Sequence, residues 1–62
     1  MKTLIIIPTY NERENIEALA EQITILNAEY HVLVVDDNSP DGTGSMVQFL
    51  GEKNCRIYTK GL

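Results

Sequence analysis

Residues 32–43 read VLVVDDNSPDGT, and this stretch decides the fold. Its first four residues are apolar and mostly β-branched, which is typical of a strand covered on both faces. The residues that follow are acidic and turn-forming, and Asp41 is placed to cap a helix that begins near Thr43. We therefore expect a buried strand that ends in a polar loop, and a helix directly after that loop.

The same pattern of apolar run, polar loop and helix occurs once earlier in the chain. The run LIII (4–7) predicts a first strand, which Pro8 ends. A helix is expected to follow, with Asn11 as its N-cap and Glu14 completing a capping box. Its apolar stripe at helical spacing comprises Ile16, Leu19, Ala20, Ile23 and Leu26.

A second helix and a third strand complete the pattern. The apolar face of this shorter helix comprises Thr43, Met46, Val47 and Leu50, and Gly51 is its expected end. A weaker strand is predicted over residues 55–59. The order β-α-β-α-β predicts an α/β fold with a three-stranded parallel sheet. Three strands leave one edge and one face uncovered, so we expect residues 1–62 to be an incomplete domain of marginal stability.

Composition excludes several classes of protein. The chain has 62 residues, a net charge of −4 and five scattered basic residues, which argues against nucleic-acid binding. Its apolar runs are far shorter than the roughly 20 residues that span a bilayer, and no signal peptide is evident, so we expect a cytoplasmic protein. Cys55 is the single cysteine and is expected to be an inert strand residue. His31 opens the second strand and is expected to be an edge residue rather than a catalytic one.

Both polar loops follow the carboxyl ends of predicted parallel strands, which is where α/β sheets bind ligands. Asp36 and Asp37 lie together in the second loop, and adjacent carboxylates repel unless a positive or donor-rich group binds there. We favour a ligand role for Asp37, because its carboxylate could accept paired N–H groups from a nucleobase. The alternatives are a turn without ligand, or a hard cation held by Asp36, Asp37 and Asp41.

The first loop offers one aromatic and one acidic side chain. Tyr10 either presents its ring for a base to stack on or packs beneath its own helix. Ionised Glu12 can only accept hydrogen bonds, so it either binds a hydroxyl or N–H group or serves the positive end of the helix dipole.

Together the motifs IIPTYNE (6–12) and VVDDNSPDGT (34–43) resemble the start of the family 2 inverting glycosyltransferases, which have the GT-A fold. The tail NSPDGT (38–43) looks most like that of the polyprenol (dolichol) monophosphate mannose synthases, which use GDP-mannose. The resemblance covers essentially the whole chain. It implies that residues 1–62 are the N-terminal, nucleotide-binding portion of a Rossmann-like GT-A domain.

The resemblance also implies a site and a reaction. Nucleotide-binding roles fall on Pro8, Tyr10, Glu12, Asp36 and Asp37, with Asp37 bonding the base. The implied reaction moves mannose from GDP-mannose to a polyprenyl phosphate, with Mg²⁺ or Mn²⁺ on the diphosphate and the full protein at the cytoplasmic face of a membrane. In this family the metal-binding Asp-x-Asp motif, the general base and the acceptor site lie further along. We therefore assign no catalytic or metal-binding residue here and expect the chain to be inactive alone.

Other interpretations differ in what they require of the sequence. A family 2 enzyme that uses a UDP-sugar is an alternative, because such enzymes differ mainly beyond position 62. A dinucleotide-binding half-domain would need Gly-x-Gly-x-x-Gly where this chain has PTYNE (8–12). A phospho-receiver domain carries its paired acids after the first strand, not the second. The non-enzyme alternative is a fragment that folds by self-association through its sheet edge.

Overall fold

The computed structural model describes residues 2–61 and has the elements in the order that the sequence predicts. Their bounds are β1 Thr3–Thr9, α1 Arg13–Leu26, β2 Tyr30–Asp36, α2 Thr43–Lys53 and β3 Ile57–Gly61. The strands form one parallel sheet in the order β1-β2-β3. The predicted β-α-β-α-β architecture is therefore confirmed.

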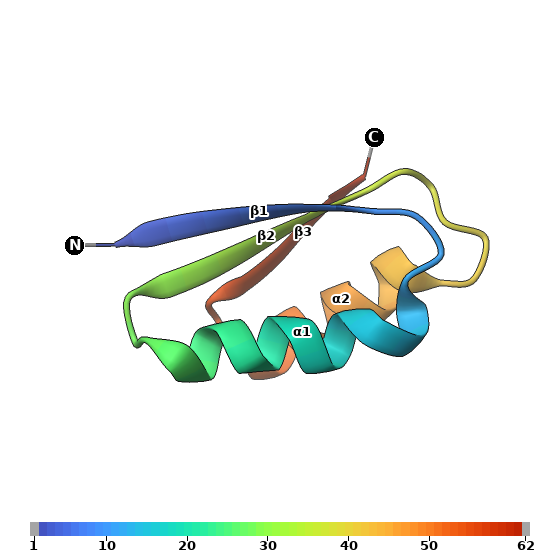
Figure 1. Ribbon diagram of the computed structural model, residues 1–62. Coiled ribbons are helices and arrows are strands. Elements are labelled where there is room, and N and C mark those ends of the chain that lie inside the picture. Colours follow the sequence, from blue (N-terminus) through green and yellow to red (C-terminus); the bar gives the residue numbers. More distant parts are fainter. Residues whose placement is uncertain (1, 62) are drawn as a thin grey trace.

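The molecule has two layers, because both helices cover the same face of the sheet (Figure 1). Each crossover moves one strand along in the same direction, and two crossovers of the same hand place their helices on the same side. The core lies between the layers and comprises Ile16, Ala20, Val32, Val34, Val47, Leu50 and Ile57. None of the helices described in residues 2–61 has the length and apolar character needed to cross a membrane.

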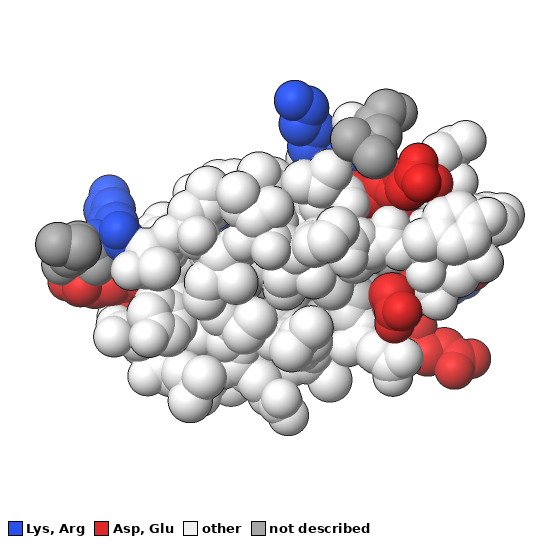
Figure 2. Space-filling view, turned by 45° about the horizontal axis from the view of Figure 1, so that its top comes forward, with Lys and Arg blue, Asp and Glu red and all other residues white. Residues whose placement is uncertain are grey.

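Within residues 2–61 nothing covers the other face of the sheet, as the sequence predicts. Alternate residues of β1 point to this face, and the side chains of Leu4 and Ile6 are 52% and 60% exposed. His31 and Tyr58 stack on neighbouring strands, with ring centroids 5.8 Å apart. Figure 2 shows a broad uncharged surface, with charged side chains at its left and right ends and at its upper edge.

The strands end level with one another at their carboxyl ends. The pairing register sets Thr9 beside Asp36 and Asp36 beside Gly61. Residues paired in this way point to the same face of a parallel sheet, which here is the face that carries the helices. This row of three residues positions the candidate site.

The strand boundaries differ from the sequence-based prediction at two positions. Pro8 does not end β1, which continues to Thr9. The strand tolerates proline because β1 is an edge strand, and the Thr9 carbonyl rather than Pro8 faces β2, where it accepts a hydrogen bond from the Asp37 N–H (3.0 Å). Cys55 is not a strand residue either, since it is exposed in the turn before β3.

The start of α1 also differs from the prediction. Glu12 is the residue before the helix, and Asn11 has a left-handed backbone with φ of 53°, so the Asn11–Glu14 capping box does not form.

The buried stripe of α1 is Ile16, Ala20 and Thr24, while Leu26 is 76% exposed. Thr24 is buried because Asn54 donates to its hydroxyl (3.3 Å) and Arg56 to its carbonyl (2.9 Å), so its polar groups stay paired.

Gly51 does not end α2, which runs on to Lys53 with Asn54 as its C-cap. Glycine is needed here for space rather than for a turn. A Cβ at position 51 would lie 2.8 Å from the Ile57 carbonyl oxygen, so any side chain would push α2 away from β3. The close packing of helix on strand therefore depends on this glycine.

We expect Gly51→Ala to lower the free energy of unfolding by about 1–3 kcal/mol, as overpacking does. Helix propensity alone predicts the opposite sign, a gain of about 1 kcal/mol. Urea unfolding followed by circular dichroism measures the difference. Gly61→Ala is the matched control, because its added methyl meets no atom within 4 Å. A Gly51→Ala chain at least as stable as the parent would show that α2 and β3 are not in close contact.

Candidate functional site

The candidate site is built around the carboxylate of Asp36, which is 5% exposed at the end of the central strand. Its Oδ1 accepts hydrogen bonds from the Thr9 hydroxyl (2.9 Å) and the Ser39 hydroxyl (2.5 Å). Its Oδ2 accepts from the Ser39 N–H (2.9 Å). One carboxylate therefore joins the end of β1 to the β2–α2 loop, residues 37–42.

The two loops also bind each other directly. The Asn11 N–H, in the β1–α1 loop (residues 10–12), donates to the Ser39 hydroxyl (2.9 Å), and the Glu12 N–H donates to the Thr43 hydroxyl (3.1 Å). Asn11 and Asn38 both have left-handed backbones, with φ of 53° and 51°. Such a backbone persists where neighbouring contacts fix it. The loops are thus held as one unit by hydrogen bonds.

Asp41 serves the N-termini of both helices. Its Oδ2 accepts from the Arg13 N–H at the start of α1 (3.1 Å), and its Oδ1 accepts from the N–H (3.0 Å) and hydroxyl of Thr43 at the start of α2. Gly42, with φ of 85°, is the residue directly before α2, so Asp41 lies one residue earlier than the N-cap position. Its carboxylate nevertheless accepts from the first N–H of α2, as expected of a helix cap. The first N–H groups of both helices, which have no partner within their helix, therefore donate to the Asp41 carboxylate.

Asp37 differs from Asp36 in its surroundings, because Asp36 is the last residue of β2 and faces the core whereas Asp37 lies just beyond the strand. Its side chain is exposed, and none of residues 2–61 donates a hydrogen bond to its carboxylate. The alternation of Val32, Val34 and Asp36 on the core face was the signal in the sequence that could have separated the two acids. The structure leaves Asp37 available to accept hydrogen bonds from a ligand.

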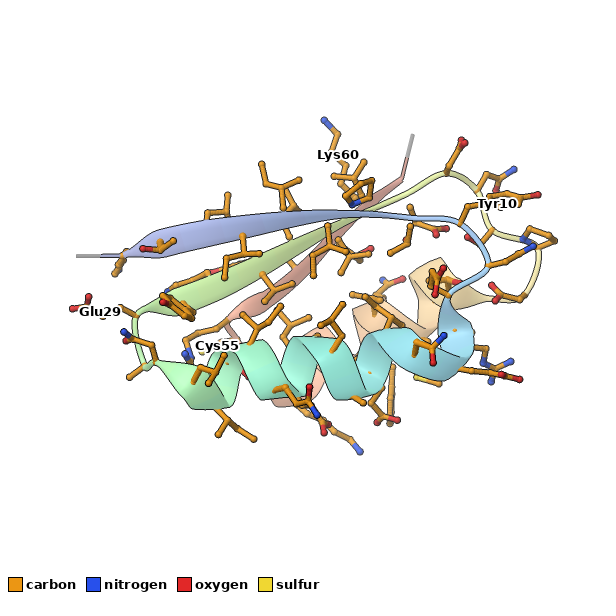
Figure 3. The ribbon with its side chains drawn as sticks, in the orientation of Figure 1. Tyr10, Glu29, Cys55 and Lys60 are labelled. Atoms are coloured by element: carbon orange, nitrogen blue, oxygen red, sulfur yellow. The ribbon has the colours of Figure 1, made fainter. Side chains whose placement is uncertain are left out.

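The other predicted site residues lie at the same end of the molecule. Tyr10 is 56% exposed, so it does not pack beneath its own helix, and Figure 3 shows it at the loops, far from Cys55 and Glu29. The Glu12 carboxylate accepts from the Asn15 side chain (3.3 Å). Pro8 and Glu12 line a small cavity of about 130 Å³ between β1 and α1.

A larger polar pocket of about 300 Å³ opens beside α2 at the carboxyl ends of β2 and β3. Its lining comprises Asp36, Asn38, Ser39, Gly42, Gly44, Ser45, Gln48, Thr59 and Gly61. Of the five predicted site residues only Asp36 lines it, so the five share one end of the molecule but no single cavity. Its volume is at the lower end of the range of about 300–1,000 Å³ that is usual for ligand pockets.

The acids of these loops do not fit a metal site. Three protein donors hold Asp36, and donors from two helices hold Asp41, so Asp37 is the acid left with free oxygens. Within residues 2–61 no three His, Cys, Asp or Glu side chains are grouped to hold an ion. The cation alternative for Asp36, Asp37 and Asp41 therefore finds no support in the geometry.

The hydrogen bonds of the two occupied acids favour their charged forms. The Ser39 hydroxyl contributes most to lowering the pKa of Asp36 below its ordinary value of 3.8, against the opposing effect of burial. The Thr43 hydroxyl contributes most to lowering the pKa of Asp41, with the Arg13 N–H adding to it. Both carboxylates are therefore ionised at neutral pH.

Comparison with known proteins gives consistent results. Residues 4–61 match the profile of Glycosyl transferase family 2. Polyprenol monophosphomannose synthase of Mycolicibacterium smegmatis is 51% identical over 49 residues, which cover 79% of this chain and 18% of that protein. Dolichol-phosphate mannosyltransferase of Pyrococcus furiosus is 49% identical over 55 residues, covering 86% of this chain and 16% of that protein.

A similar structure is the mannosyltransferase from Pyrobaculum calidifontis, solved in complex with GDP-Man and Mn²⁺. It superposes with a TM-score of 0.71 and 30% identity over 95% of this chain. The expected fold, the first part of a Rossmann-like GT-A domain, is confirmed by this likeness. The chain spans 16–18% of the length of these three proteins.

The hydrogen bonds to Asp36 and Asp41 predict a chain that loses stability in acid. Because each folded-state pKa is lowered, the unfolded chain binds more protons in the interval between the folded and unfolded values. The free energy of unfolding should therefore stay constant above about pH 5 and fall as the pH is lowered from there through the folded-state pKa values. Urea unfolding at a series of pH values measures this.

Asp36→Asn should flatten this acid dependence as well as lower stability at pH 7. Asp37→Asn is the matched control, since its carboxylate takes no hydrogen bond within residues 2–61 and the acid dependence should remain. An Asp36→Asn chain with the parent's full loss of stability in acid would contradict the assignment.

Proposed function

Because this chain belongs to glycosyl transferase family 2, we propose that it forms the nucleotide-binding portion of an enzyme that transfers mannose from GDP-mannose to a polyprenyl phosphate. One observation supports the nucleotide role: the side chains of Tyr10 and Asp37 are both exposed at the carboxyl edge of the sheet. Tyr10 offers a ring face and Asp37 offers a carboxylate, one from each of two loops that are bonded together. The names of the relatives, and the GDP-Man bound in the similar structure, support the choice of donor.

Guanine fits a free carboxylate better than uracil does. The edge of guanine carries two adjacent N–H donors, from N1 and from the exocyclic amine, and a carboxylate can accept both at once. Uracil offers one N–H donor between two carbonyl oxygens, which would face the second carboxylate oxygen with an acceptor. Asp37 therefore favours a GDP-sugar over the UDP-sugar alternative.

In the proposed reaction, an oxygen of the acceptor phosphate bonds to the anomeric carbon of mannose as the bond to GDP breaks, which inverts the configuration. The residues of this chain hold the donor by its base. Tyr10 stacks on the base, Asp37 accepts its N–H groups, and Pro8 and Glu12 shape the adjoining wall. The assignment of residues 1–62 as the nucleotide-binding portion of a larger catalytic domain is part of this proposal, and turnover would require residues outside this chain.

A divalent ion on the diphosphate is proposed for the whole enzyme only. The similar structure holds Mn²⁺, but the acids of this chain do not fit an ion site, since Asp36 and Asp41 are occupied by protein donors. A lipid acceptor would place the whole enzyme at the cytoplasmic face of a membrane. Self-association of this chain through its exposed sheet edge stays a prediction.

Nucleotide titration of the purified chain tests this proposal. GDP should shift the NMR signals of Tyr10 and Asp37, while UDP should bind at least tenfold more weakly because it lacks the second donor. IDP, whose base lacks the exocyclic amine of guanine, should fall between them. Equal shifts with GDP and UDP would favour the UDP-sugar alternative, and no shifts in a folded chain would contradict nucleotide binding by residues 1–62.

Variants at the two exposed side chains should separate their contributions. Asp37→Asn should weaken GDP binding about tenfold, because the amide offers one acceptor where two are needed. Tyr10→Phe should bind GDP as the parent does, since stacking needs only the ring, whereas Tyr10→Ala should bind it more weakly. His31→Gln, at the amino end of β2, is the control that should leave affinity unchanged. Unchanged affinity in Asp37→Asn would remove Asp37 from the site.

A further inference from the structure

We propose that Asp36 is a positioning residue, which sets the distance between the β1–α1 loop and the β2–α2 loop and so places Tyr10 opposite Asp37. This inference rests on the proposed nucleotide site and assigns Asp36 a role apart from contact with the base.

The location of Asp36 favours an internal role. Its side chain is 5% exposed, and Oδ2 lies 3.2 Å from where a Cβ at Gly44 would be, so the carboxylate is held against the first turn of α2. The positive end of a helix dipole favours an anion at such a place. Both of its oxygens already accept from Thr9 or Ser39, so the carboxylate is not free to accept the paired N–H groups of a base.

The partners of Asp36 come from both sides of the site. Thr9 directly precedes Tyr10, and its carbonyl also accepts from the Asp37 N–H (3.0 Å). Ser39 belongs to the other loop and relays the contact to the Asn11 N–H. Asp36 is therefore at the centre of a chain of hydrogen bonds that runs across the gap between the two loops.

The charge of Asp36 fixes the direction of these bonds. An ionised carboxylate only accepts, so both hydroxyl protons must point toward it. The Ser39 oxygen is then left with its lone pairs free to accept from Asn11. An asparagine at position 36 would offer one acceptor oxygen to three donors, and its NH₂ group would compete for the Ser39 oxygen.

The test uses Thr9→Val, which keeps the shape of the side chain and removes the hydroxyl that reaches Asp36. Thr9 is 5% exposed and its hydroxyl donates to the Asp36 carboxylate, so the hydroxyl is turned toward Asp36 rather than toward a ligand. We expect Thr9→Val to weaken GDP binding about tenfold and Thr9→Ser to restore it. The Thr9→Val/Asp36→Asn double variant should lose little more than Asp36→Asn alone, because the two residues share one interaction.

Val34→Ala is the matched control for stability. Val34 lies on β2 two residues before Asp36, and its side chain is fully buried in the core and makes no hydrogen bond to either loop. This variant should therefore be less stable yet bind GDP within twofold of the parent. The positioning role is overturned if Thr9→Val binds GDP like the parent, or if Val34→Ala weakens binding as much as Thr9→Val does.

Amide hydrogen exchange gives a second measurement that needs no ligand. Thr9→Val should speed exchange at Asn11, Asp37 and Ser39 about tenfold more than at core amides, whereas Val34→Ala should speed exchange throughout the chain. If the parent chain binds no GDP, the proposed function fails for residues 1–62, and exchange alone decides the positioning role. Unchanged exchange at those three amides in Thr9→Val would then overturn it.

Discussion

Two buried polar side chains, Thr9 and Asp36, lie side by side where the sheet ends, and the structure depends on their bonding each other. A hydroxyl or carboxylate that loses its partner in such a place costs about 1–3 kcal/mol, and more when it is charged. Sliding β1 by one residue against β2 would remove this pairing and turn the Thr9 hydroxyl to the other face of the sheet. The Thr9–Asp36 hydrogen bond is therefore required for the register of the sheet, for the path of both loops and for the shape of the candidate site.

Much of the fold follows from the sequence because its strongest signals are local. Two apolar runs, each followed by a polar loop and an amphipathic helix, are enough to predict a parallel sheet with both loops at one edge. The element boundaries were less predictable, because they depend on contacts between distant residues. Asn11 is no helix cap, since the cap of α1 comes from Asp41 on another loop. Gly51 is no helix end, since its role is to let the Ile57 carbonyl approach.

Some residues of the candidate site could likewise be predicted from local sequence motifs, whereas others became apparent only in the folded molecule. Sequence motifs located Tyr10 and the acid pair, and the comparisons bear out the family that those motifs suggested. Which acid faces the core depends on strand parity, and Val32 and Val34 carry that signal in the chain. Thr9 and Ser39 were not found, because a hydroxyl in a loop acquires its importance only from the carboxylate that it meets in the folded molecule. The polar pocket beside α2 was missed for the same reason, since its walls come from two strands, a loop and a helix.

The sharing of Asp41 between two helices limits which residues that position can accept in related sequences. Serine and threonine cap single helices well, but each has only one hydroxyl oxygen. That oxygen could not accept from both the Arg13 N–H at the start of α1 and the Thr43 N–H at the start of α2. Asparagine would turn an N–H group toward one of two helix ends that need an acceptor, and glutamate would carry its oxygens one methylene too far. Aspartate alone combines two acceptor atoms with a short side chain. In related sequences this position should therefore change more slowly than other positions on surface loops.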